Sequence, residues 1–208
     1  MNKTATQNGK IPRNASNSIS LIMNAVIGCI ASHGYEGASM QDIAMSANVS
    51  KSLLHYHFKS KEDLVISALT MLTTDIVKEI REAVLDQVPS LQSLMQSADL
   101  LYERLISKKE RVEFFVEMYA TAIHNARLRE KMEDYHRLQA KLIREILEGT
   151  IGGLFIEDNV LDLTKLTEMV QTAIEGLSID SVFLRDEEKI RARFSSIINL
   201  IITMIIRK

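Results

Sequence analysis

The sequence predicts an all-α protein, and three observations carry this prediction. Apolar residues recur at spacings of three and four along most of the 208-residue chain, which is the spacing of one helix face. Long stretches are rich in Leu, Ile, Ala, Glu, Lys, Arg and Met, the residues that favour helices. Only eight glycines and two prolines interrupt the chain, and Pro12 and Pro89 both lie outside the helical patterns.

A polar arm and one helix are expected at the start of the chain. Residues 1–15 carry three basic groups and no acidic group, and we expect them to form a flexible basic arm. The apolar residues from Ile19 to Ile30 follow one helix face. Gly34 should end this helix, because glycine readily adopts the left-handed conformation of a helix C-cap.

Two short helices joined by a tight turn are expected next. Ser39 is placed to cap the first, and Asp42, three residues later, can complete a capping box. Asn48 should occupy the turn, because asparagine tolerates the left-handed region. Ser50 should cap the second helix, at about 51–57. Two capped helices in this arrangement predict a helix-turn-helix.

Longer helices are expected to fill the rest of the chain. One begins near Lys61 and has ended by Pro89. The others are expected at about 90–107, 110–125, 127–149, 162–184 and 186–207. The predicted organisation is therefore the arm at 1–15, a three-helix helix-turn-helix domain at 16–63 and a larger helical domain at 64–208.

The segment from Gly34 to Leu64 reads GYEGASMQDIAMSANVSKSLLHYHFKSKEDL. This pattern resembles the TetR family of bacterial transcription regulators. The matching residues are Gly34, Tyr35, Gly37, Ser39, Ile43, Ala44, Ala47, Val49, Ser50, Leu54, Phe58, Lys61 and Leu64. The resemblance implies a DNA-binding domain followed by a ligand-binding and dimerisation domain, and a repressor that a small molecule releases from a palindromic operator.

The second short helix carries most of the expected contacts to double-stranded DNA. A helical wheel turns Leu54 and Phe58 toward the core and leaves the other side chains facing outward. Lysines attract phosphates, hydroxyl and ring groups can bond phosphates or base edges, and leucine can meet the methyl group of thymine. The expected DNA-binding residues are Ser39, Gln41, Lys51, Ser52, Leu53, His55, Tyr56, His57 and Lys61.

The larger domain is expected to bind a mostly apolar effector and to form a homodimer. Met and aromatic side chains at about 90–149 suit an apolar cavity with few polar anchors, although an ordinary core would look the same. The expected effector-binding residues are Met95, Tyr102, Phe115, Met118, Tyr119, His124 and Tyr135. Apolar stripes in the last two helices favour a four-helix dimer interface over a monomer core. The expected interface residues are Ile174, Leu177, Phe194, Ile198, Ile201 and Ile205.

Charge and composition agree with a cytoplasmic protein that meets a polyanion. Residues 1–61 carry six basic and two acidic groups, whereas the remainder carries 19 basic and 25 acidic groups. The single cysteine, Cys29, excludes an intrachain disulfide. The most apolar segment, 194–206, spans 13 residues, fewer than the roughly 20 that cross a membrane. We therefore expect no membrane contact.

Two other classes of protein are alternatives to a transcription regulator. A di-iron enzyme in a helical bundle would need two Glu-x-x-His motifs, and the sequence has one, Glu133 to His136. A purely structural helical adaptor would not need a basic, capped helix with a polar outer face. The sequence shows no motif of a known catalytic site, so we expect neither an enzyme nor a metal site nor a bound cofactor.

Overall fold

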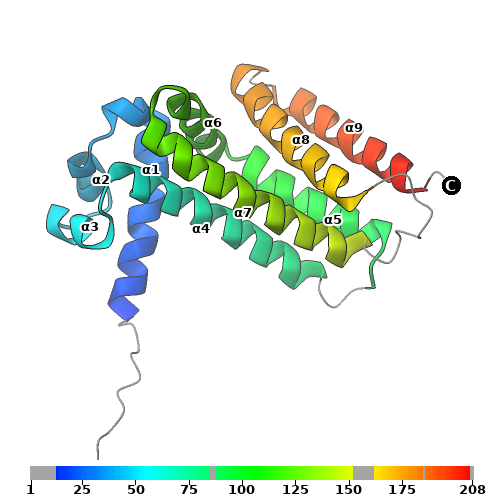
Figure 1. Ribbon diagram of the computed structural model, residues 1–208, viewed down its shortest axis with the longest axis horizontal. Coiled ribbons are helices and arrows are strands. Elements are labelled where there is room, and N and C mark those ends of the chain that lie inside the picture. The colour runs from blue at the N-terminus through cyan, green and yellow to red at the C-terminus, as the bar shows by residue number, and fades with distance from the viewer. Residues whose placement is uncertain (1–12, 85–87, 152–161, 185, 207–208) are drawn as a thin grey trace, which may run out of the picture.

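The computed structural model describes residues 13–84, 88–151, 162–184 and 186–206, and every regular element in these ranges is a helix. The helices are α1 (Arg13–Gly37), α2 (Met40–Ser46), α3 (Lys51–His57), α4 (Lys61–Val84), α5 (Leu91–Leu101), η1 (Tyr102–Ile106), α6 (Lys109–His124), α7 (Ala126–Ile151), α8 (Leu163–Leu184) and α9 (Glu187–Ile206). In Figure 1, α1–α3 gather at one end, α4 and α7 run along the body, and α8 lies beside α9. The predicted all-α class is confirmed.

The expected helix at 90–107 is present in two parts. α5 continues directly into η1, a π-helical turn in which the Ser107 N–H donates to the Tyr102 carbonyl over 2.9 Å. This wider turn adds a residue without ending the helix. The helices α2, α3, α6, α7, α8 and α9 begin and end within two residues of the expected positions, and α4 begins at Lys61 as expected but ends at Val84, before Pro89.

α1 changes direction at Gly34. This glycine has φ 70° and ψ 171°, a combination open almost only to glycine. The regular helix therefore ends at Gly34 as predicted, and a single further turn follows it. α1 begins at Arg13, so residues 13–15 of the expected arm are helical in their backbone, and residues 1–12 lie outside the described ranges.

The local signals of the helix-turn-helix are confirmed. The Asp42 N–H donates to the Ser39 hydroxyl over 3.2 Å, and the Ser39 N–H donates to the Asp42 carboxylate over 3.0 Å. Asn48 has φ 53° in the turn. The Ser50 hydroxyl accepts from the Leu53 N–H over 3.1 Å and so caps α3. These bonds satisfy backbone donors that a helix start leaves open.

Two hydrophobic cores stabilise the molecule. The first joins α1–α3 and the near half of α4 to α6 and the start of α7, with Leu54 of α3 fully buried in it. The second joins the far half of α4 to α5, η1, α7, α8 and α9. The segment Ser18–Gly37 is long and apolar enough to cross a membrane, but Ile22 and Val26 on its apolar face are fully buried in the first core.

Substitution of the two glycines in α1 should have opposite effects on stability. Gly34→Ala should lower the free energy of unfolding by about 1–3 kcal/mol, because alanine is strained at this φ and ψ and its Cβ would lie 3.2 Å from a Glu117 carboxylate oxygen. Gly28→Ala should raise it by about 0.5–1 kcal/mol, because the position is helical and its Cβ meets nothing within 4 Å. Denaturant unfolding measures both values, and equal effects would contradict the strain at Gly34.

Candidate DNA interface and effector cavity

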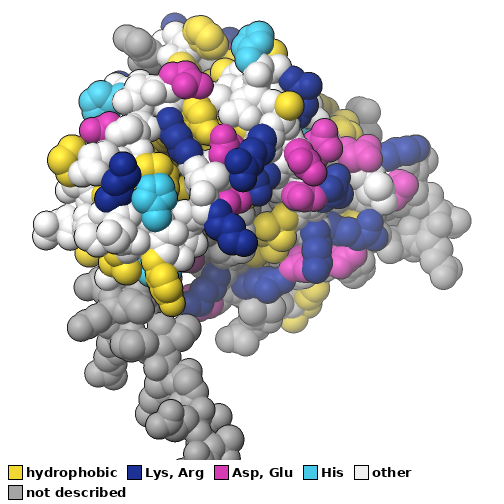
Figure 2. All heavy atoms as spheres, turned by 60° about the vertical axis from the view of Figure 1, so that its left-hand side comes forward, with side chains coloured by type: hydrophobic (Ala, Val, Ile, Leu, Met, Phe, Trp, Pro, Cys, Tyr) yellow, Lys and Arg dark blue, Asp and Glu magenta, His cyan; other side chains and the backbone are white. Residues whose placement is uncertain are grey.

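α3 presents a polar face to solvent beside α2. Lys51, Ser52, His55 and Tyr56 are exposed, and Tyr56 has 82% of its surface accessible. Leu54 is fully buried on the opposite side, and its burial turns this polar arc outward. In Figure 2, which brings this end of the molecule forward, Lys, Arg and His side chains are prominent on the surface.

The other expected DNA contacts differ in how free their side chains are. Leu53 and His57 are half-buried at the flanks of the polar arc, and the His57 ring meets the Tyr56 ring edge-on, with 5.1 Å between centroids. Ser39 and Gln41 of α2 are exposed. The Ser39 hydroxyl is occupied as the helix cap, and its hydrogen bonds lower the pKa of Asp42.

Lys61 is turned inward in this structure. Its ammonium donates to the Tyr35 carbonyl and lies 4.0 Å from the centre of the Tyr35 ring. Burial lowers the pKa of this ammonium. The same tyrosine donates its N–H to Glu117 over 2.6 Å and its hydroxyl to Glu62 over 3.1 Å. We call this group the Tyr35 junction, because it connects α1 to α4 and α6.

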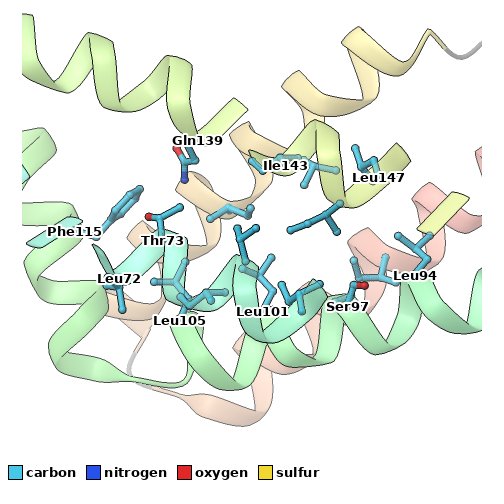
Figure 3. Close-up of a pocket in the computed structure, with 18 of the residues that line it drawn as sticks. Leu72, Thr73, Leu94, Ser97, Leu101, Leu105, Phe115, Gln139, Ile143 and Leu147 are labelled. Atoms are coloured by element: carbon cyan, nitrogen blue, oxygen red, sulfur yellow. The ribbon is translucent and has the colours of Figure 1, made fainter. Parts of the chain in front are cut away.

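A cavity of about 100 Å³ lies in the larger domain, and Figure 3 shows its lining side chains spread out along the helices. Side chains from α4, α5, η1, α6, α7, α8 and α9 line it, and most of them are Leu, Ile or Val. Figure 3 shows Thr73, Phe115 and Gln139 toward one end and Leu94, Ser97 and Leu147 toward the other. No charged side chain of the described residues lines the cavity, so its walls suit an apolar molecule.

Two of the expected effector-binding residues line this cavity, Phe115 and Tyr135. The Tyr135 hydroxyl bonds to the Thr73 hydroxyl over 2.8 Å, and burial raises its pKa to about 12. Tyr135 is therefore a neutral hydrogen-bonding group at neutral pH.

The other five expected residues lie elsewhere. Met118 and Tyr102 are buried in the two cores, where the Tyr102 ring packs on Phe194 at 5.1 Å between centroids. Tyr119 donates its hydroxyl to Glu175 over 3.0 Å. Met95 and His124 are exposed on the surface. Apolar and aromatic residues occur in the cavity wall, in the packed cores and on the outer surface, so residue type alone does not identify the residues that line the cavity.

Three polar residues of the cavity wall, Thr73, Ser97 and Gln139, were not expected from the sequence. Thr73 lies on α4, which was expected only to carry an apolar face, and Gln139 lies on a helix in which glutamine reads as a solvated residue. The lining positions Leu72, Thr73 and Ile76 do follow helical spacing, but the same spacing describes any buried face.

The expected interface residues of α8 and α9 mostly face this chain's own core. Ile174, Leu177, Phe194 and Ile201 have at most 5% of their surface exposed, and Ile198 lines the cavity. The side chain of Ile205 lies outside the described residues. The exposed apolar residues of these helices are instead Met169, Ile179, Phe183, Leu184 and Leu200.

The helix-turn-helix matches a known family. Residues 22–68 match the profile of "Bacterial regulatory proteins, tetR family". Among curated proteins, the HTH-type transcriptional regulator BetI of Agrobacterium fabrum is 24% identical over 158 residues, which are 76% of this chain and 73% of that protein.

Solved structures share the whole fold. A regulator of the TetR family from Rhodococcus sp. superposes with a TM-score of 0.72 at 23% identity, over 91% of this chain and 99% of that one. The transcriptional regulator FadR of Bacillus subtilis, solved in complex with stearoyl-CoA, has a TM-score of 0.67 at 20% identity, over 87% of this chain and 96% of its own. The profile match, the curated relative and the shared fold agree, and the chain is similar to the TetR family of bacterial regulatory proteins over most of its length.

Proposed function

We propose that this protein is a cytoplasmic homodimeric repressor that binds a palindromic operator and releases it when a small, mostly apolar effector fills the cavity. The observation that carries the proposal is the exposed polar arc at the start of the capped helix α3, within the segment that matches the DNA-binding domain of the family. A recognition helix reads the major groove from its N-terminal residues in this way.

The side chains of α3 divide into two roles in this proposal. Lys51, Tyr56 and His57 contact phosphates, since an ammonium attracts them and a phenol or imidazole can donate to them. Ser52 and His55 reach base edges. The exposed Ser39 and Gln41 of α2 lie near the backbone of the duplex, and the basic residues of the arm add charge.

The effector is expected to be elongated and apolar, because the cavity is lined by aliphatic side chains and no described charged residue. The FadR of Bacillus subtilis offers a parallel, since it was solved with stearoyl-CoA. Release of DNA requires that the effector bind the DNA-incompetent state more tightly, since equal affinity for both states shifts nothing. α6 is suited to transmit this preference, because Phe115 lines the cavity and Glu117 holds the Tyr35 junction.

The dimer is expected to form through the outer faces of α8 and α9. Ile179, Phe183 and Leu200 are exposed there, with 77% of Phe183 accessible. A shallow groove between the two helices is lined by small residues such as Ala173, Gly176 and Ala192. Helices from two copies can approach closely over such a surface.

The two alternatives, an enzyme and an adaptor, are less well supported. The His136 side chain of the lone Glu-x-x-His motif pairs with Glu175 at 2.7 Å. The described residues contain no group of three potential metal ligands. An adaptor does not account for the match to a DNA-binding domain.

The first DNA measurement separates the two lysines. A duplex is first selected from a random pool by the full-length protein, and its affinity is measured against salt concentration. Lys51→Ala should reduce the slope of log K against log salt by about 1, because one phosphate contact is lost, and should leave stability unchanged because Lys51 is exposed. Lys61→Met should lower the unfolding temperature and leave the slope unchanged. If both variants reduced the slope of log K against log salt equally, Lys61 would also contact a phosphate.

Leu53 should read a thymine methyl group in each half-site. Burial of the pair is worth roughly 1 kcal/mol at about 25 cal/mol per Å², so replacing that thymine by uracil should weaken wild-type binding several-fold. Leu53→Ala should bind more weakly and ignore the same exchange. If the wild type tolerates uracil at every thymine of the selected duplex, base reading falls to Ser52 and His55.

A charge on the outer face of α8 should prevent dimerisation. Phe183→Glu should yield monomers in sedimentation at micromolar concentration, because a carboxylate would be buried without a partner. Ile123→Glu is the matched control, since Ile123 is 63% exposed on α6 and its variant should remain dimeric. A monomeric wild type, or a dimeric Phe183→Glu variant, would contradict this interface.

The selected operator should show half-sites about 34–36 Å apart or a multiple of that distance.

A further inference from the structure

Gln139 is the most unusual residue of the cavity wall. It lies on α7 among aliphatic neighbours, and 4% of its surface is exposed. A buried amide carries two donor hydrogens and an acceptor oxygen, and each needs a partner. The hydrogen bonds behind Gln139 determine which of these groups faces the cavity.

The orientation of the neighbouring Gln171 follows from a backbone carbonyl. The side-chain nitrogen of Gln171 lies 3.2 Å from the His136 carbonyl oxygen. A carbonyl oxygen only accepts, so the amide atom at this position must be the NH₂ group. The same nitrogen lies 3.2 Å from Oε1 of Gln139 and 3.0 Å from Nδ1 of His136.

The series of hydrogen bonds continues from Gln171 through His136 to the carboxylate of Glu175. Because Nδ1 of His136 faces the NH₂ group of Gln171, Nδ1 is an acceptor and the ring proton lies on Nε2. Nε2 lies 2.7 Å from Glu175, which also accepts the Tyr119 hydroxyl over 3.0 Å. Both partners of Glu175 therefore donate to it.

The oxygen of Gln139 consequently faces Gln171, and its NH₂ group must point the other way. Figure 3 shows that this nitrogen is on the cavity side. It makes no hydrogen bond to any described residue. Gln139 thus presents a donor to an otherwise apolar space, at the end of the cavity that also contains Thr73 and Phe115.

The remaining polar groups of the wall agree with this reading. Thr73 and Tyr135 share one hydrogen bond between two hydroxyls, which leaves a further hydroxyl hydrogen at this end. Ser97, toward the opposite end, donates to the Ser93 carbonyl of its own helix over 2.8 Å. The free donors therefore gather at one end, and the described residues of the wall supply no charge to neutralise an ion.

We propose that the effector is an elongated aliphatic molecule with a neutral carbonyl group, such as a ketone, ester or thioester, whose oxygen accepts a hydrogen bond from the NH₂ group of Gln139. This inference rests on the proposed effector cavity. A cation is excluded by the donors at the polar end, and a carboxylate would be buried without a positive partner.

Two isosteric probes test the proposal on the full-length protein. In 2-methyl-1-octene a CH₂ group replaces the carbonyl oxygen of 2-octanone, so the molecules differ in the acceptor alone. The wild type should bind the ketone about three- to tenfold more tightly, the range expected for one net hydrogen bond. Titration calorimetry, or the shift of the unfolding temperature in buffer saturated with each probe, measures the preference. The ketone should also weaken binding to the selected operator.

Two variants assign the preference to Gln139. Gln139→Met has a similar shape but no donor, and it should bind both probes alike. Ser97→Ala is the matched control at the other end of the cavity, and it should keep the wild-type preference. Binding of the alkene by Gln139→Met shows that the cavity is intact, and the comparison of the two probes on the wild type stands even if that variant does not fold.

The outcomes separate the cavity from its polar end. If the wild type binds both probes equally, or if Gln139→Met still prefers the ketone, the role of Gln139 is overturned while the effector cavity stands. Tighter binding of octyltrimethylammonium than of 2-octanone would also overturn it, because a cation offers no acceptor. If no probe binds the wild type, the effector cavity falls as well.

Discussion

The orientation of the DNA-binding helices depends on one residue, Tyr35. Its N–H donates to Glu117 of α6 over 2.6 Å, and its carbonyl accepts the Lys61 ammonium of α4. Both backbone groups of Tyr35 are therefore bonded to helices of the body. Gly34 makes this possible, since its φ of 70° turns the chain out of α1 immediately before Tyr35. Because Leu54 fixes α3 in the core shared with α1 and α4, the position of the reading face follows from this junction.

The same junction connects two functions that the sequence separates. Phe115 and Glu117 lie on one helix, the first in the cavity wall and the second on Tyr35. Charge-assisted hydrogen bonds in a partly buried site are among the stronger polar contacts, so a shift of α6 would be passed to α1 and not absorbed between them. The first hydrophobic core is continuous across this contact, and the helix-turn-helix is therefore no independent unit attached by a linker.

Local chemistry made the fold predictable from sequence, whereas contacts between distant residues were not. Ser39 bonds to Asp42 and Ser50 bonds to Leu53, each pair three residues apart, and Asn48 acts through its own backbone conformation. Such local roles can be predicted from residue type and spacing. Lys61 reaches Tyr35, 26 positions earlier, and no local signal distinguishes that contact from a phosphate contact. The apolar stripe of α9 that contains Phe194 and Ile201 is a second case in which the sequence does not show the contact partner. Its spacing predicts an apolar face, but not whether that face meets its own chain or a second copy.

Gln139 shows why the character of a binding cavity lies beyond sequence patterns. On α7 it follows a polar, charged neighbourhood, and a glutamine there reads as solvated. It is buried because Gln171 of α8, 32 positions later, packs against it and takes up its oxygen. The direction of its amide is then decided by a backbone carbonyl, at His136, whose acceptor character is the same in every sequence. The donor in the cavity is thus a consequence of packing between two helices, and only the three-dimensional contacts reveal it.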